Sequence, residues 1–198
     1  MDTKQLTLGL VAILGIGGLA AAGLYFYTPV AEEQQVPAPE VPEEPTQATF
    51  NSTELGLMFN YPSTYTLQTH EQGTAERMWT VLTLIDSEIL EQAIENGASE
   101  GPPAIAIQVF DNVEEYTVEQ WITGMSHSNF KLSPDEVLSP TTVGGEQGLS
   151  YRHSGLYEHN ATVVAHGGKI YLFSAGWLTP QDENIHDFEH LLETVSFY

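Results

Sequence analysis

The stretch EQGLSYRHSGLYEHNATVVAHGGKIYLFSAGW, residues 146–177, decides the fold of this chain. Together with the residues just before it, it contains four strand-like segments: 137–143, 146–153, 158–166 and 169–177. The segments are separated by Gly144-Gly145, Ser154-Gly155 and Gly167-Gly168. Paired glycines suit two-residue hairpin turns, because such turns need positive φ angles. The pattern therefore predicts an antiparallel meander.

The residues before the meander alternate between strand and helix patterns. Short apolar or alternating runs predict strands at residues 48–51, 57–60, 65–69, 78–85 and 104–110. The first two should form a hairpin around residues 52–56. A helix through Asn96 can be capped by Asp86 or Ser87 and ended by Gly97. The apolar residues of this helix share one face: Ile89, Leu90, Ala93 and Ile94.

Two further helices have their own start signals. Thr117 and Gln120 form a capping box, which opens a helix through about His127. We expect it to bury Trp121, Ile122 and Met125. After the meander, Thr179 as cap and Pro180 at the first helical position predict the last helix. Its buried stripe should consist of Ile185, Phe188, Leu191, Leu192 and Val195. Residues 48–198 thus predict an α+β domain, an antiparallel β-sheet flanked by helices.

The N-terminal part predicts a membrane anchor. Residues 6–27 carry no charge and, as a helix, would rise about 33 Å, enough to cross the bilayer core. The run ends in Tyr25, Phe26 and Tyr27, which suit the membrane interface. Lys4 is the only basic residue before it, in a short cytoplasmic segment of residues 1–5, and the next is Arg77. We therefore expect a single-pass transmembrane helix, or signal-anchor, with the C-terminal domain on the extracytoplasmic side.

A cleaved signal peptide is the alternative interpretation of the same segment. Residues 6–16 would be its apolar region, and Ala20-Ala21-Ala22 resembles a cleavage site. The hydrophobic run continues past that site to Tyr27, which favours an uncleaved anchor. Residues 28–47 are rich in proline and glutamate, a composition that favours extended chain. This linker would reach at most about 60 Å and would hold the domain away from the membrane.

Charge and composition limit the functions open to the chain. It has 27 acidic and 5 basic residues, a formal net charge of −22, and no cysteine. Such a surface repels nucleic acid and anionic lipid headgroups and attracts cations or a basic partner. A solvated acidic face, adaptation to high salt and a specific cationic partner all fit this balance. The lack of cysteine excludes disulfides, thiolate metal sites and thiol nucleophiles.

Several features together resemble a known family. They are the segment Gly56-Leu-Met-Phe-Asn-Tyr-Pro62 after a short strand, the Val143-Gly-Gly-Glu-Gln-Gly148 turn, the meander, and a final helix ending in Val195-Ser-Phe-Tyr198. This combination, over residues 50–198, resembles the PsbP-like fold, an α/β/α sandwich. The photosystem II extrinsic protein, a Ran-binding nuclear-import factor and many bacterial anchored proteins share that fold. The resemblance implies a non-enzymatic binding or assembly domain, and it assigns no functional residue.

Three groups of side chains are candidates for a site. His186 and His190, four residues apart on the last helix, can chelate one metal ion, and Glu193 lies on the same outer face. This spacing predicts a weak zinc site. Alternation places Tyr171, Phe173 and Trp177 on one face of the last long strand, either as core or as an open apolar binding groove. His153, His159 and His166 sit at the ends of meander strands and can gather at one sheet edge.

No catalytic motif accompanies these candidates. The sequence contains no G-x-S-x-G elbow, Walker loop, dinucleotide fingerprint or EF-hand loop, and nothing in it calls for a cofactor. We therefore expect a membrane-anchored, extracytoplasmic domain that acts by binding or assembly, with a protein as its possible partner. A cell-envelope hydrolase or accessory enzyme is one alternative. A weak cation- or metal-binding module is another.

Overall fold

The computed structural model describes residues 46–74, 77–98 and 100–198. All of them belong to one compact unit, Pro42–Tyr198. The predicted anchor at residues 6–27 and nearly all of the linker at residues 28–47 lie outside the described residues. Within the part that is described, no helix has the length and apolar character needed to cross a membrane.

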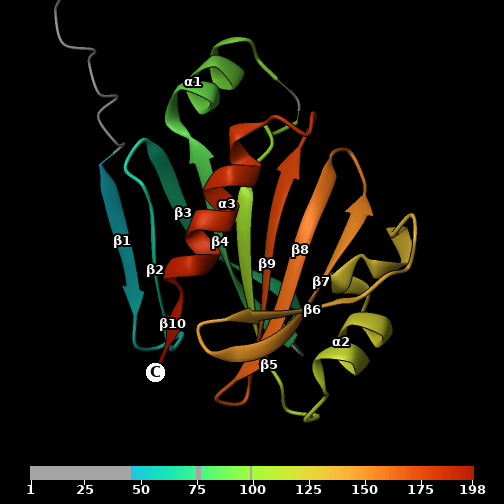
Figure 1. The fold of residues 1–198 in the computed structure, drawn as a ribbon. Coiled ribbons are helices and arrows are strands. Elements are labelled where there is room, and N and C mark those ends of the chain that lie inside the picture. The colour runs from blue at the N-terminus through green and yellow to red at the C-terminus, as the bar shows by residue number, and fades with distance from the viewer. Residues whose placement is uncertain (1–45, 75–76, 99) are drawn as a thin grey trace, which may run out of the picture. The chain divides into compact units, whose positions relative to one another are not determined.

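Two antiparallel sheets form in the described part of the chain (Figure 1). The larger sheet has seven strands in the order β3-β4-β5-β9-β8-β7-β6. Its strands are β3 (Tyr65–Thr74), β4 (Arg77–Asp86), β5 (Ile105–Asp111), β6 (Ser139–Val143), β7 (Glu146–Ser154), β8 (Glu158–His166) and β9 (Lys169–Trp177). The smaller sheet has the order β1-β2-β10, from β1 (Gln47–Ser52), β2 (Leu57–Pro62) and β10 (Ser196–Phe197).

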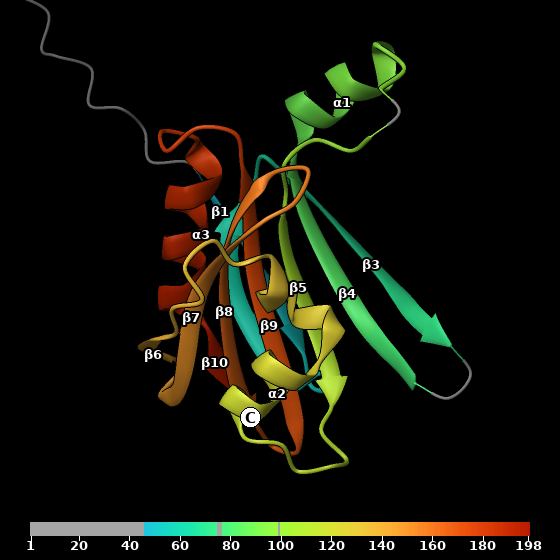
Figure 2. The ribbon, with the colours of Figure 1, turned by 90° about the vertical axis from the view of Figure 1, so that its right-hand side faces the viewer.

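Helices lie on both faces of the larger sheet. The described helices are α1 (Ser87–Glu95), at one end of that sheet, α2 (Val118–Gly124) and α3 (Glu183–Thr194), with 3-10 turns η1 (Ser126–Ser128) and η2 (Phe130–Leu132). The helix α3 and strand β2 cover one face, whereas α2 packs against the other (Figures 1 and 2). The expected α+β class and α/β/α layering are confirmed. The separation of β1, β2 and β10 into their own sheet was not predicted.

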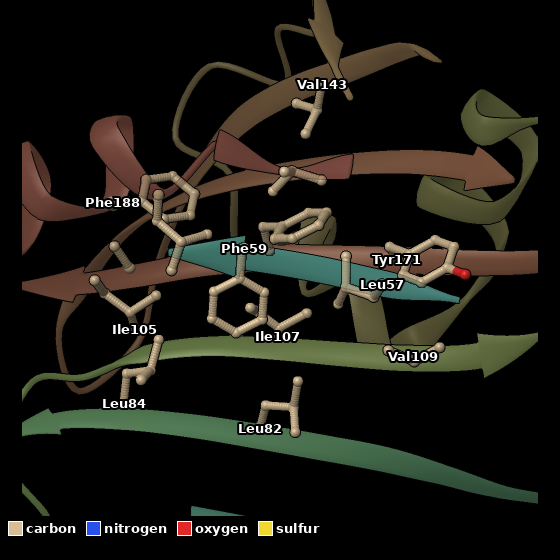
Figure 3. Packing of buried hydrophobic residues seen from close by; sticks show 14 of the residues in the cluster. Leu57, Phe59, Leu82, Leu84, Ile105, Ile107, Val109, Val143, Tyr171 and Phe188 are labelled. Atoms are coloured by element: carbon tan, nitrogen blue, oxygen red, sulfur yellow. The ribbon is translucent and has the colours of Figure 1, made fainter. Parts of the chain in front are cut away.

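The strand β9 divides two hydrophobic cores. Its residues Tyr171 and Phe173 pack with Leu57 and Phe59 of β2 in the larger core, which Figure 3 shows over the strands β4 and β5. Its residue Leu172 points to the opposite face and packs with α2. Fully burying one such side chain stabilises the fold by about 1.5–3 kcal/mol. The two faces of a single strand therefore hold both helical layers in place.

Two of the three predicted turns are present as two-residue glycine turns. The third, at Ser154-Gly155, is a longer connection, because Ser154 still pairs with Glu158. Gly144 and Gly145 have φ angles of +58° and +86°, and Gly167 and Gly168 have +55° and +77°. The capping box of Thr117 and Gln120 is also present. Its helix α2 ends at Gly124, and the 3-10 turns continue the segment towards β6.

The start of α3 differs from the expected one. The helix begins at Glu183, three residues after the predicted first position at Pro180, with Asp182 as its cap residue. The Asp182 carboxylate instead accepts hydrogen bonds from the backbone N–H of Leu178 at 2.6 Å and from the Thr179 hydroxyl at 2.5 Å. Because Asp182 holds the preceding turn, Thr179 and Pro180 stay outside the helix.

A substitution at Gly148 tests how closely strands β7 and β8 pack. A Cβ atom at this position would lie 2.5 Å from the backbone oxygen of Val163 and 2.5 Å from a Val164 methyl. We expect Gly148→Ala to lower the free energy of unfolding in urea by about 1–3 kcal/mol, because backbone cannot move aside easily. The control is Gly124→Ala, where no atom of the described residues lies within 4 Å of an added Cβ. It should change stability by less than about 1 kcal/mol. Equal effects of both substitutions would contradict this packing.

Candidate functional site

The aromatic face of β9 belongs to the interior. Tyr171 and Phe173 are 1% and 0% exposed, and Trp177 is also buried. The Tyr171 hydroxyl donates to the Leu55 carbonyl at 2.7 Å, and the Trp177 Nε1–H donates to Asn160 Oδ1 at 3.3 Å. The suggestion that Tyr171, Phe173 and Trp177 form an open binding groove is therefore corrected. These side chains are core, because β2 and α3 cover their strand.

Two of the three meander histidines come together. His153 of β7 is directly opposite His159 of β8, and their rings stack at 4.6 Å with an interplanar angle of 11°. His166 lies at the other end of β8, because successive hairpin turns fall at opposite ends of the sheet. There it contacts Glu146 at 2.8 Å and the Tyr198 backbone oxygen at 3.1 Å. The expected gathering at one edge holds for the first two histidines only.

The pKa values of these histidines shift in opposite directions, because the stacked pair is buried and His166 is paired with a carboxylate. His153 is 6% exposed, and its Nδ1 finds no hydrogen-bond partner among the described residues. Burial lowers the pKa of His153 to about 4, helped by the neighbouring His159 and opposed by the Glu158 carboxylate. Burial also lowers the pKa of His159. In contrast, the hydrogen bond with the Glu146 carboxylate raises the pKa of His166.

The predicted pair on the last helix lines an open cavity. His186 and His190 lie on the exposed side of α3 with ring centroids 4.4 Å apart. Both face a cavity of about 590 Å³ between α3 and the β1–β2 hairpin. Glu193 Oε2 is 3.6 Å from His190 Nδ1 but is not among the residues that line the cavity. Among the described residues, no three His, Cys, Asp or Glu side chains converge as a metal site would require. The zinc site stays a prediction.

Two carboxylates that the sequence reasoning missed share this face. Glu183 and Asp187 line the cavity beside His186 and His190. The spacing 183, 186, 187 and 190 is that of one helix face, and this signal could have identified them. Each position lies three or four residues from a neighbour in the set. The result is a helix face that alternates carboxylate and imidazole towards solvent.

A second, more acidic cavity adjoins the first. It measures about 310 Å³ and shares Pro62, Glu183 and Asp187 with the larger cavity. Asp86 and Glu88, at the start of α1, complete its acidic lining. The Tyr65 hydroxyl donates to Asp187 Oδ2 at 2.7 Å, and burial with this contact raises the pKa of Tyr65. We call the two cavities together the α3 groove. Its chemistry suits a cationic group, since four carboxylates and, among the described residues, no lysine or arginine line the two cavities.

Comparisons with known proteins identify the fold. Neither the known protein-family models nor the curated proteins contain a match to this chain. Among solved structures, the domain is similar to the cyanobacterial PsbP of Synechocystis sp. PCC 6803, at 12% identity and a TM-score of 0.50. That match covers 78% of this chain and 94% of the other. A protein from Bacteroides thetaiotaomicron VPI-5482 matches at 11% identity and a TM-score of 0.45, over 76% of this chain and 48% of that one. The domain has a PsbP-like fold.

The stacked histidines make stability depend on pH. The His153 pKa is lower in the folded state than its ordinary value of 6.5. Its stabilising contribution is therefore present above about pH 6.5 and is lost as the pH falls towards 4. Allowing for partial solvent screening, we expect His153→Leu to remove roughly 1–2 kcal/mol of this dependence. Urea unfolding between pH 7.5 and 4.5 measures it.

The matched control is His190→Leu, which makes the same substitution at an exposed histidine of α3. His166 acts in the opposite sense, because its raised pKa adds stability at low pH that is lost as the pH rises through that pKa. An unchanged pH profile in His153→Leu would show that the stacked pair does not titrate as described.

Proposed function

We propose that the chain is a membrane-anchored extracytoplasmic protein whose PsbP-like domain acts by binding or assembly. Residues 6–27 would form the single-pass anchor, with the N-terminus in the cytoplasm because Lys4 precedes the helix. Residues 28–47 would be the tether that holds the domain away from the bilayer. The negative charge of the chain argues against nucleic acid as a partner.

The α3 groove is the observation that carries this proposal. It is open to solvent and lined by the carboxylates of Glu183 and Asp187 and by the imidazoles of His186 and His190. These groups suit reversible contacts with a basic protein surface, which electrostatic complementarity would orient. The strongly shifted histidine, His153, lies instead in the packed interior, where a substrate does not reach it. This arrangement favours binding over a hydrolase in the cell envelope.

Photo-crosslinking in native membranes tests both the anchor and the groove. A photoreactive residue in place of His190 should capture a protein partner when the unwashed membranes are irradiated. A later wash with alkaline carbonate then removes unanchored chains. The control is the same residue at Val113, which is 82% exposed and does not line the groove. We expect the chain to stay in the washed membranes and an adduct to form at His190 alone.

Two outcomes of this experiment would contradict the proposal. Recovery of the chain in the wash, shortened near Ala20-Ala21-Ala22, would show a cleaved signal peptide instead of an anchor. Adducts that contain only the chain itself would exclude a different protein as the occupant of the groove.

A weak metal-binding module is the second candidate function. The specific observation in its favour is the contact of the His186 and His190 rings at the wall of the larger cavity. Residues four apart on a helix can place both imidazoles on one ion, and Asp187, Glu183 or Glu193 can add an oxygen ligand. The side chains would have to rotate towards a common point to do so.

Calorimetry with zinc chloride tests this second function. We expect weak binding that His186→Ala abolishes, because one imidazole alone is a poor ligand set. His70→Ala is the control, since His70 is exposed on β3 and away from the groove. The absence of heat in the parent protein, or equal heat in His186→Ala, would rule out a zinc site at this helix face.

A further inference from the structure

The helix α1 has an apolar face that the described residues leave uncovered. An amphipathic helix normally packs such a face against a core. In α1 no residue is buried, and Ile89 and Ile94 are 47% and 70% exposed. Leu90 and Ala93 on the same face are only half-buried. Figure 2 shows α1 projecting beyond the end of the larger sheet.

The helix is well formed despite its exposure. The Asp86 carboxylate accepts hydrogen bonds from the backbone N–H groups of Glu88 and Ile89, both at 3.0 Å. At the other end, Gly97 has a φ of +62° and the Ala98 N–H bonds to the Ala93 carbonyl at 3.0 Å. Both ends are therefore capped, as in a stable helix. The apolar face is presented on a defined scaffold.

The side of α1 opposite this face, and the groove beside the start of the helix, are acidic. The helix carries Glu88, Glu91 and Glu95 and has no basic residue. Asp86 and Glu88 also line the acidic end of the α3 groove, with Glu183 and Asp187 opposite them. A second copy of this chain would bring like charges together, and anionic lipid headgroups would be repelled in the same way. A partner with apolar residues and positive charges complements this surface.

The uncovered face lies at the end of the domain that the linker enters. The Ser63 N–H bonds to the Thr46 carbonyl at 2.8 Å, next to the first strand. One residue further, the Thr64 carbonyl accepts from the N–H of Ser87, the first residue of α1, at 3.0 Å. Two hydrogen bonds thus connect the end of the linker to the start of α1. In the anchored arrangement, this is the end attached to the membrane tether.

We propose that α1 and the acidic end of the α3 groove form a docking surface for a basic amphipathic helix of a partner protein. Its apolar residues would cover Ile89, Leu90, Ala93 and Ile94, as a helix does in a recognition groove. Its lysine or arginine side chains would reach Asp86 and Asp187 at the acidic end of the groove. The inference rests on the proposed binding function and specifies the chemistry of the partner.

A defined peptide probe tests this docking surface. The full chain is placed in nanodiscs of zwitterionic lipid and titrated with an amphipathic leucine–lysine helix of 18 residues, with empty nanodiscs as the blank. An oligolysine of equal charge is the comparison probe. We expect the amphipathic peptide to bind at least about tenfold more tightly than the oligolysine, because only it offers apolar contacts.

Substitutions on α1 test whether the peptide binds at its apolar face. The double variant Ile89→Ser/Ile94→Ser should abolish the preference for the amphipathic peptide, and its thermal unfolding should match the parent because both side chains are exposed. The control Val113→Ser, at another exposed apolar position, should bind as the parent does. Equal binding of the two peptides, or an unchanged preference in the double variant, would overturn the proposal.

The outcomes separate this inference from the proposed function. If the peptide binds at α1 while His190 captures no partner in membranes, the docking surface stands and the role assigned to the α3 groove fails. If His190 captures a partner and the double variant still prefers the amphipathic peptide, the binding function stands and the assignment to α1 fails.

Discussion

The burial of β9 on both faces is the constraint on which the rest of the domain depends. This strand joins β5 to β8 in the sheet, and its alternate side chains enter different cores. Tyr171 and Phe173 hold the layer made by α3 and β2, whereas Ile170 and Leu172 hold α2. A chain with a formal net charge of −22 repels itself in the compact state, so this shared core must supply the opposing free energy.

Short-range sequence patterns predicted several local features of the structure correctly. The glycine pairs at 144–145 and 167–168 predicted the turns, because positive φ is a property of the residue itself. The bounds of β9 and the capping box of α2 followed from equally local patterns. The choice between two competing local hydrogen-bonding roles of one side chain was less accessible. The side chain of Asp182 could have capped α3 but instead binds the preceding turn, and short-range rules do not distinguish these uses.

The candidate site shows the same division. The four-residue spacing of His186 and His190 identified a helix face that lines a cavity, and periodicity alone contained that information. It could not show that β2 and α3 would cover Tyr171 and Phe173 while α1 would keep Ile89 and Ile94 exposed. Both segments are apolar on one face in the sequence, and only the pairing of distant strands decides which face is covered.

The pairing of β2 has a consequence for how the chain is made. Asn60 of β2 bonds to the Thr194 hydroxyl, 134 residues later, and Leu57 pairs with Phe197 of β10. Chains are synthesised from the N-terminus, so the β1–β2 hairpin emerges long before its cover exists. Until then Leu57 and Phe59, which are fully buried in the finished domain, remain open to other molecules. A nascent chain of this protein therefore exposes the apolar β1–β2 hairpin before its covering elements are made. A chain that stopped before α3 would leave that hairpin exposed permanently.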